Sequence, residues 1–221
     1  MPNQSSALSR NNIAFIGLAH EYCVTLENTL GAERAAFIDK MAKLLPRIYI
    51  CALDLSAPYD DNADQLLESF TDEARYETIR SQIAALMEAD DDFLEVFTPD
   101  MQFSEGAITS TISESLTDIY QDLYDCIGTV RENGTDDVVA EVLAATRAHF
   151  DEYWGQTLCN VMRAIHALRS QYHEDNDGHH HHHDDDCDCG HHHHHDDDCD
   201  CGHHHHHDDD CDCGRHHHHD E

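Results

Sequence analysis

The amino-acid sequence predicts an all-α protein, an irregular bundle of about five helices that carries a disordered C-terminal tail. Apolar residues recur at steps of three and four along five segments before residue 175, which is the pattern of amphipathic helices. No run alternates with period two, and no hairpin turn joins two β-branched runs, so strands are not expected. The last 43 residues contain no aliphatic or aromatic side chain. Because a segment without apolar surface cannot offset its ordering entropy, we place the helical domain at 1–175 and the tail at 176–221.

The first two helices are predicted on either side of Gly31. Apolar residues recur at helical steps over about 9–28, and a wide apolar face follows over about 32–55. Pro46 lies inside the second pattern and is expected to kink that helix, because proline removes a backbone donor and crowds the preceding turn.

A polar loop is expected over 56–70, before the third helix. Thr71 is the residue expected to cap that helix, which should end at the acidic run 90–92. An irregular connector follows, and its apolar residues at 93–97 are expected to pack back onto the bundle.

The fourth helix should begin near Thr111, because Thr111 and Glu114 have the spacing of a capping box. Gly134 suits the position just beyond its C-terminal end. A long fifth helix is then expected over 135–172, capped by Thr135 and locally weakened by Gly155, since glycine is a poor helix former.

The net charge of the chain limits the partners that it can bind. The chain has a formal charge of −34, of which 14 acidic residues and one arginine in the tail make −13, leaving −21 for residues 1–178. Both parts should repel nucleic acid and anionic membranes and attract cations, although in the first part solubility alone accounts for the charge.

We see no signal peptide and expect a cytoplasmic protein. The four cysteines before the tail lie in apolar segments and are expected to be core or boundary residues: Cys23, Cys51, Cys126 and Cys159.

The tail repeats the unit HHHHHDDDCDCG three times, over 179–190, 191–202 and 203–214, and ends in a shortened RHHHHDE. Each unit offers imidazoles, carboxylates and a Cys-Asp-Cys pair, which are ligands for zinc, nickel and copper. The predicted metal ligands are His179, His180, His181, His182, His183, Cys187, Cys189, His191, His192, His193, His194, His195, Cys199, Cys201, His203, His204, His205, His206, His207, Cys211, Cys213, His216, His217, His218 and His219.

The ligand spacing favours several loosely held ions over one structural zinc. Structural zinc sites commonly separate their paired cysteines by two to four residues, whereas one residue separates each pair here. At about four ligands per ion, the 19 histidines and six cysteines of the tail could hold on the order of six ions. Metal must displace protons from thiols and, in mild acid, from imidazoles, and the Asp charges raise the pKa of both groups, so loading should fall with pH.

The tail has three competing interpretations, which stay open. It could be an expanded repeat without a selected role, as the identity of its units suggests, or an acidic solubilising segment, or an expression tag. An acidic segment leaves the 19 histidines unexplained, and tags do not carry interleaved Cys-Asp-Cys.

The helical domain offers two polar stripes. On the fourth helix Glu114 is followed by Asp118, Asp122 and Asp125 at steps of four, four and three. The stripe of the fifth helix contains His149, Glu152, Gln156, Cys159, Arg163 and His166. The two stripes could form a second metal site or an acid–base site, but two solvated faces explain them more simply. No phosphate loop, nucleophile elbow or zinc-protease motif is present, so we do not expect an enzyme.

Four sequence stretches together resemble one bacterial family. They are FIDKMAKLLPRIYICALDL (37–55), DDFLEVFTPD (91–100), TISESLTDIYQDLYD (111–125) and FDEYWGQTLCNVMRAIHALRS (150–170). Over about residues 10–172 the chain resembles the domain-of-unknown-function family numbered 5063. The resemblance implies a small cytosolic all-α domain and brings no activity or site residues with it. The tail lies outside the shared region and is similar in composition to the His- and Cys-rich tails of bacterial nickel chaperones.

The sequence therefore predicts storage or delivery of Zn, Ni or Cu ions through the tail. The alternative is a non-enzymatic interaction or adaptor domain, with a protein partner, whose tail binds metal incidentally. Neither hypothesis involves nucleic acid or a membrane.

Overall fold

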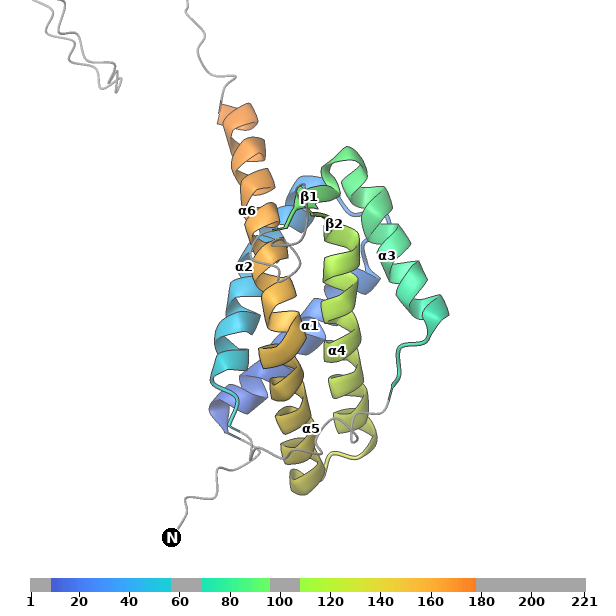
Figure 1. The fold of residues 1–221 in the computed structure, drawn as a ribbon, viewed down its shortest axis with the longest axis vertical. Helices are drawn as coiled ribbons and strands as arrows, with labels where there is room; N and C mark the ends of the chain where they lie inside the picture. The colour runs from blue at the N-terminus through green and yellow to red at the C-terminus, as the bar shows by residue number, and fades with distance from the viewer. Residues whose placement is uncertain (1–8, 57–68, 96–107, 178–221) are drawn as a thin grey trace, which may run out of the picture. The chain divides into compact units, whose positions relative to one another are not determined.

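The computed structural model describes residues 9–56, 69–95 and 108–177, and it divides the chain into two units at His180 and His181. All the described residues belong to the first unit, which is an irregular helical bundle (Figure 1). The predicted all-α fold is confirmed. The tail ligands at 179–219 lie outside the described residues.

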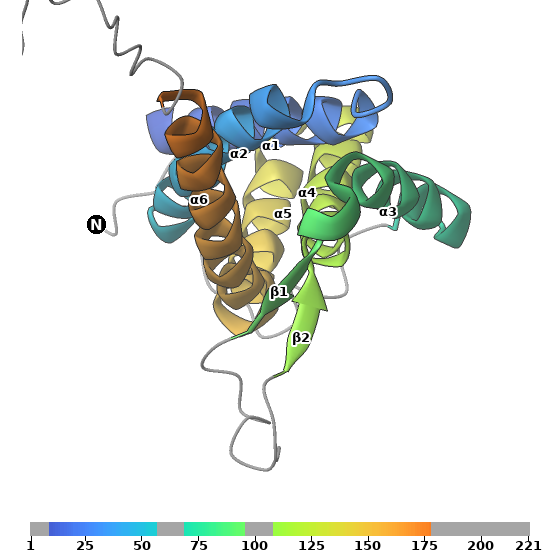
Figure 2. The same ribbon diagram turned by 90° about the horizontal axis from the view of Figure 1, so that it is seen from above.

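Helices α1 (Arg10–Glu27) and α2 (Arg34–Leu53) form one outer layer of the bundle (Figure 2). Ser9 caps α1 by accepting from the backbone N–H of Asn12 at 3.1 Å, and Glu33 caps α2 with both carboxylate oxygens. Gly31 between them has a φ of 78°, a left-handed value that glycine adopts without strain. Helix α2 continues past Pro46.

Helix α3 (Glu73–Met87) begins two residues later than Thr71 because Asp72, not Thr71, is its cap. The Asp72 carboxylate accepts from the backbone N–H of Arg75 at 2.8 Å. A short 3-10 turn, Glu88–Asp90, closes the helix. The prediction that Thr71 caps this helix was wrong, because its hydroxyl donates to Asp125 instead.

The expectation that the chain has no strand was also wrong. Strands β1 (Asp92–Leu94) and β2 (Thr109–Thr111) form a two-stranded antiparallel sheet that pairs Asp92 with Thr111. Each strand has three residues, too few for an alternating pattern to be recognised. Phe93 packs against the core while Leu94 is exposed, so the connector packs back only in part; Val96 and Phe97 lie outside the described residues.

Helix α4 (Ile112–Glu132) begins at the predicted cap, where Thr111 accepts from the backbone N–H of Glu114 at 3.2 Å. Asp91 adds a second cap, because its carboxylate accepts from the backbone N–H and hydroxyl of Ser113 at 2.8 and 2.7 Å. At the other end Gly134 does not adopt the left-handed conformation expected of it.

The predicted long fifth helix is continuous, but its middle is a π-helical turn and not α-helix. Helix α5 (Asp136–His149) passes into a π-helical turn, Phe150–Trp154, and on into α6 (Gly155–Asp177). Gly155 sits where this turn ends, and a Cβ there would lie 2.5 Å from the backbone oxygen of Phe150. The glycine is therefore required by the π turn. Helix α6 also runs two residues beyond the predicted domain boundary at 175.

The core lies between the α1–α2 layer and helices α4 to α6. Its largest fully buried side chains include Trp154, Tyr22 and Tyr120. The hydroxyl of Tyr22 donates to the backbone oxygen of Leu116 at 2.8 Å, which ties α1 to α4. Among the described residues, no helix is long and apolar enough to cross a membrane.

Candidate functional site

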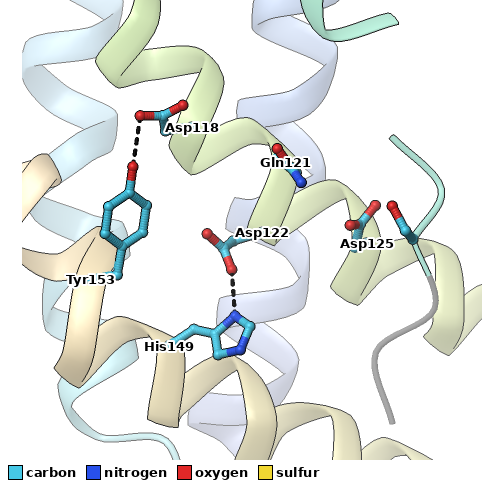
Figure 3. A pocket seen from close by; sticks show the side chains of 7 residues that line it. Asp118, Gln121, Asp122, Asp125, His149 and Tyr153 are labelled. Atoms are coloured by element: carbon cyan, nitrogen blue, oxygen red, sulfur yellow. Dashed lines mark hydrogen bonds and ion pairs between the residues drawn. The ribbon is translucent and has the colours of Figure 1, made fainter. Parts of the chain in front are cut away.

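A polar hollow of about 340 Å³ lies where α4 faces the junction of α5 and the π turn. We call it the α4–α5 pocket, and its lining residues are Ser69, Asp118, Gln121, Asp122, Asp125, His149 and Tyr153. Figure 3 shows the carboxylates of α4 on one side and His149 and Tyr153 on the other. Three carboxylates and no Lys or Arg line the pocket, so its field is negative.

Asp122 and His149 form the centre of the pocket. The Nδ1 atom of His149 lies 2.8 Å from a carboxylate oxygen of Asp122, and the two side chains are 34% and 14% exposed (Figure 3). Burial raises the pKa of Asp122, and the nearby imidazole offsets part of that effect. A carboxylate bound to Nδ1 fixes the orientation of an imidazole, which is the arrangement that acid–base sites use.

Asp118 lies one helical turn before Asp122 and accepts hydrogen bonds from two tyrosines. The hydroxyl of Tyr76 on α3 donates to it at 2.6 Å, and the hydroxyl of Tyr153 donates to it at 2.8 Å. Burial, followed by these bonds to a carboxylate, raises the pKa of both phenols, so both remain protonated donors. Asp118 thus connects α3, α4 and the π turn.

Asp125 has a structural role at the edge of the pocket. One of its oxygens accepts from the backbone N–H groups of Phe70 and Thr71 at 2.8 and 3.0 Å, and from the Thr71 hydroxyl at 3.0 Å. Burial raises the pKa of Asp125, and these three bonds act in the opposite direction. The ring of Phe70 lies on Gly128, where a Cβ would come within 2.4 Å of it. Asp125 and Gly128 together hold the entry to α3 against α4.

The structure brings some of the predicted stripe residues together and separates others. Asp118, Asp122, Asp125 and His149 meet in the α4–α5 pocket. Glu114 and His166 are exposed and do not line it. The remaining residues of the fifth-helix stripe, Glu152, Gln156, Cys159 and Arg163, do not line it either. Of these four residues Asp125 is buried and the other three are partly exposed, so they lie at the border between solvent and the bundle and not on a fully exposed face.

Sequence patterns did not single out Tyr76, Tyr153, Ser69 or Gln121. The stripe was drawn at the period of a regular α-helix, and the π turn changes that phase between His149 and the residues of α6. The one feature of the sequence that could have indicated Tyr153 is its hydroxyl, which needs a hydrogen-bond partner when the ring is buried. That partner, Asp118 on α4, is known only from the structure.

Metal ligands are not assembled in the described part of the chain. No group of three or more His, Cys, Asp or Glu side chains is placed there to hold an ion. Cys23 and Cys126 are buried and Cys51 and Cys159 are half-buried, all as free thiols, as expected of core and boundary residues. Burial raises the pKa of Cys126 to about 11, which keeps that thiol protonated.

The fold and pocket define a small all-α domain in which two adjoining helices and a π turn enclose a polar hollow. The chain belongs to the family described as a domain of unknown function, DUF5063, whose model matches residues 6–171. The fold is similar to that of a crystal structure of protein BF1032 from Bacteroides fragilis, with 33% sequence identity and a TM-score of 0.63. That match covers 73% of this chain and 93% of the other. A search of curated proteins gave no match.

Proposed function

We propose that this protein binds transition-metal ions, Zn, Ni or Cu, through its C-terminal repeats, for storage or delivery in the cytoplasm. The observation that carries the proposal is the ligand repeat, in which 19 histidines and six cysteines recur with 14 acidic residues over 43 positions. Imidazole and thiolate are the protein ligands that these metals prefer, and the Asp charges concentrate cations around them.

The organisation of the chain supports assigning metal binding to the tail. The family match ends at residue 171, eight residues before the first repeat, and the buried core extends from Phe15 to Ile165. The described core is built from residues of the family domain, so a chain without the repeats should still fold. The ligand-rich composition of the repeats supports metal binding as their role.

Equilibrium dialysis against Zn²⁺ and Ni²⁺ tests the proposal. The full chain is compared with a chain ending at Gly178, which keeps the whole core and removes the repeats. We expect the full chain to take up on the order of six ions and the shortened chain fewer than one, at about four ligands per ion. Equal uptake by the two chains would assign binding to the helical domain and refute the proposal.

The alternative proposal is that the helical domain is a non-enzymatic interaction module with an incidental tail. Large apolar side chains on its surface support it, among them Ile13, Leu30 and Ile50. An affinity capture with residues 1–178 tests for a partner, and failure to recover one that saturates with a defined stoichiometry would count against this alternative.

A further inference from the structure

Helix α1 has an exposed face that no other described element covers. Its exposed positions between Arg10 and Glu27 are Ile13, Ala14, Gly17, His20 and Val24. None of the five is a carboxylate, a lysine or an arginine, in a chain with a formal charge of −34. Glu21 lies on the flank of this face, where it is 3.8 Å from Arg47 of α2.

The exposed residues follow the repeat of two packed helices. Arg10, Ile13, Gly17, His20, Val24 and Glu27 are separated by three, four, three, four and three residues, and all six are exposed. Alternating steps of three and four keep side chains on one face along a helix that packs against another. We call these six residues the α1 seam, which is about 26 Å long at 1.5 Å per residue.

The described residues give no structural reason for a glycine at position 17. It lies in the middle of α1, and a Cβ there would meet nothing within 4 Å. A glycine inside a helix costs about 1 kcal/mol relative to alanine, so an exposed one without a packing reason is unexpected. A missing side chain is explained if a second helix has to approach the backbone at that point.

We propose that the α1 seam is the interface of a symmetric antiparallel homodimer. Running two copies of the seam in opposite directions places Arg10 opposite the partner's Glu27, Ile13 opposite the partner's Val24, and Gly17 opposite the partner's His20. The seam is therefore complementary to itself in charge, in apolar character and in size. Self-complementarity is what a two-fold interface requires, because the same patch serves both subunits.

Electrostatics favour this orientation and this partner. In a parallel pair Arg10 would face Arg10 and Glu27 would face Glu27, so like charges would oppose each other at both ends. Two copies of so acidic a chain repel each other overall, whereas the seam carries one charge of each sign at its ends. Within its own chain Glu27 accepts from the Tyr120 hydroxyl at 2.8 Å and lies 3.4 Å from Arg75, and these two contacts hold its carboxylate in place at the end of the seam.

Analytical ultracentrifugation of the full chain tests the proposal, in EDTA and reductant so that bound metal and disulfides do not link the tails. We expect a monomer–dimer equilibrium at micromolar concentrations. Val24→Asp should weaken it at least about tenfold, because it buries a charge, and Arg10→Glu about fivefold, because it faces the partner's Glu27. Leu94→Asp is the matched control, an exposed leucine on β1, and should leave the equilibrium unchanged.

Two further variants separate dimer contacts from folding. Gly17→Glu should raise the stability of the monomer, because glutamate is a better helix former, and yet abolish the dimer. Arg10→Glu combined with Glu27→Gln, which removes the facing carboxylate and keeps an acceptor for the Tyr120 hydroxyl, should recover part of the association that Arg10→Glu loses. A chain that stays monomeric in EDTA, or a dimer that Val24→Asp and Arg10→Glu leave unchanged, would overturn the proposal. Neither result bears on metal uptake by the tail, which dialysis measures separately.

Discussion

Gly155→Ala is the substitution that most sharply tests the π turn between α5 and α6. The added Cβ would lie 2.5 Å from the backbone oxygen of Phe150 and 3.0 Å from its ring. The backbone N–H of Gly155 donates to that same oxygen, so the clash falls on the hydrogen bond that closes the turn. The neighbouring rings of Phe150 and Trp154 pack edge to face at 4.6 Å, which leaves the Phe150 ring little room to move.

Two opposing effects set the size of the change. Alanine is favoured over glycine inside a helix by about 1 kcal/mol. Forcing an extra methyl group into a packed site costs about 1 to 3 kcal/mol. The clash is with a backbone atom, which cannot move aside as a flexible side chain could. We therefore expect the steric cost to exceed the gain in helix propensity, and the free energy of unfolding to fall by about 1 to 2 kcal/mol.

Urea unfolding followed by circular dichroism measures this difference, at protein concentrations low enough to keep the chain monomeric. Gly17→Ala is the matched control, because Gly17 is also inside a helix but has open space around it. That variant should be stabilised by about 0.5 to 1 kcal/mol. If Gly155→Ala were stabilised to the same extent, the π turn would not require glycine and the reasoning would be wrong.

Three further outcomes are expected. Asp125→Ala should lower the free energy of unfolding by about 1 to 3 kcal/mol, because it leaves the half-buried N–H of Phe70 and the buried N–H of Thr71 without an acceptor; an unchanged urea midpoint would contradict this. Burial raises the pKa of Asp122 in the folded state, so its contribution to stability is fully present below the unfolded pKa and is lost as the pH rises through the folded pKa. The amide of Asp122→Asn does not titrate, so its stability relative to wild type should rise from about pH 4 to pH 7, and a constant difference would refute the assignment. Zn²⁺ uptake by the full chain should fall as the pH drops from about 7 to 5, while retention of bound zinc at the lower value would exclude imidazole as the main ligand.

The sequence predicted those parts of the fold that depend on local signals. The apolar repeats located the helices, and the spacing of Thr111 and Glu114 located the start of α4. Residues whose roles depend on distant partners were not predictable. Thr71 has the chemistry of a helix cap, but Asp125 on another helix accepts its hydroxyl, and the cap falls on Asp72.

In the α4–α5 pocket, too, the residues that share one helix were predictable and their partners on other elements were not. The steps of four and three along α4 put Asp118, Asp122 and Asp125 on one side, and the sequence alone shows that. Which residues of the facing helix meet them depends on the π turn, which has no sequence signature beyond a glycine. His149 was therefore identified, whereas Tyr153 became evident only from its bond to Asp118.

The metal content of the isolated protein tests the proposed function most directly. The full chain, without a tag, is purified without a metal-affinity column or chelator, and its metals are counted by elemental analysis. Our account predicts several Zn, Ni or Cu ions per chain, and their loss from a chain that ends at Gly178. A full chain that emerges with less than one ion, and takes up no more when metal is supplied at neutral pH under reducing conditions, would contradict it.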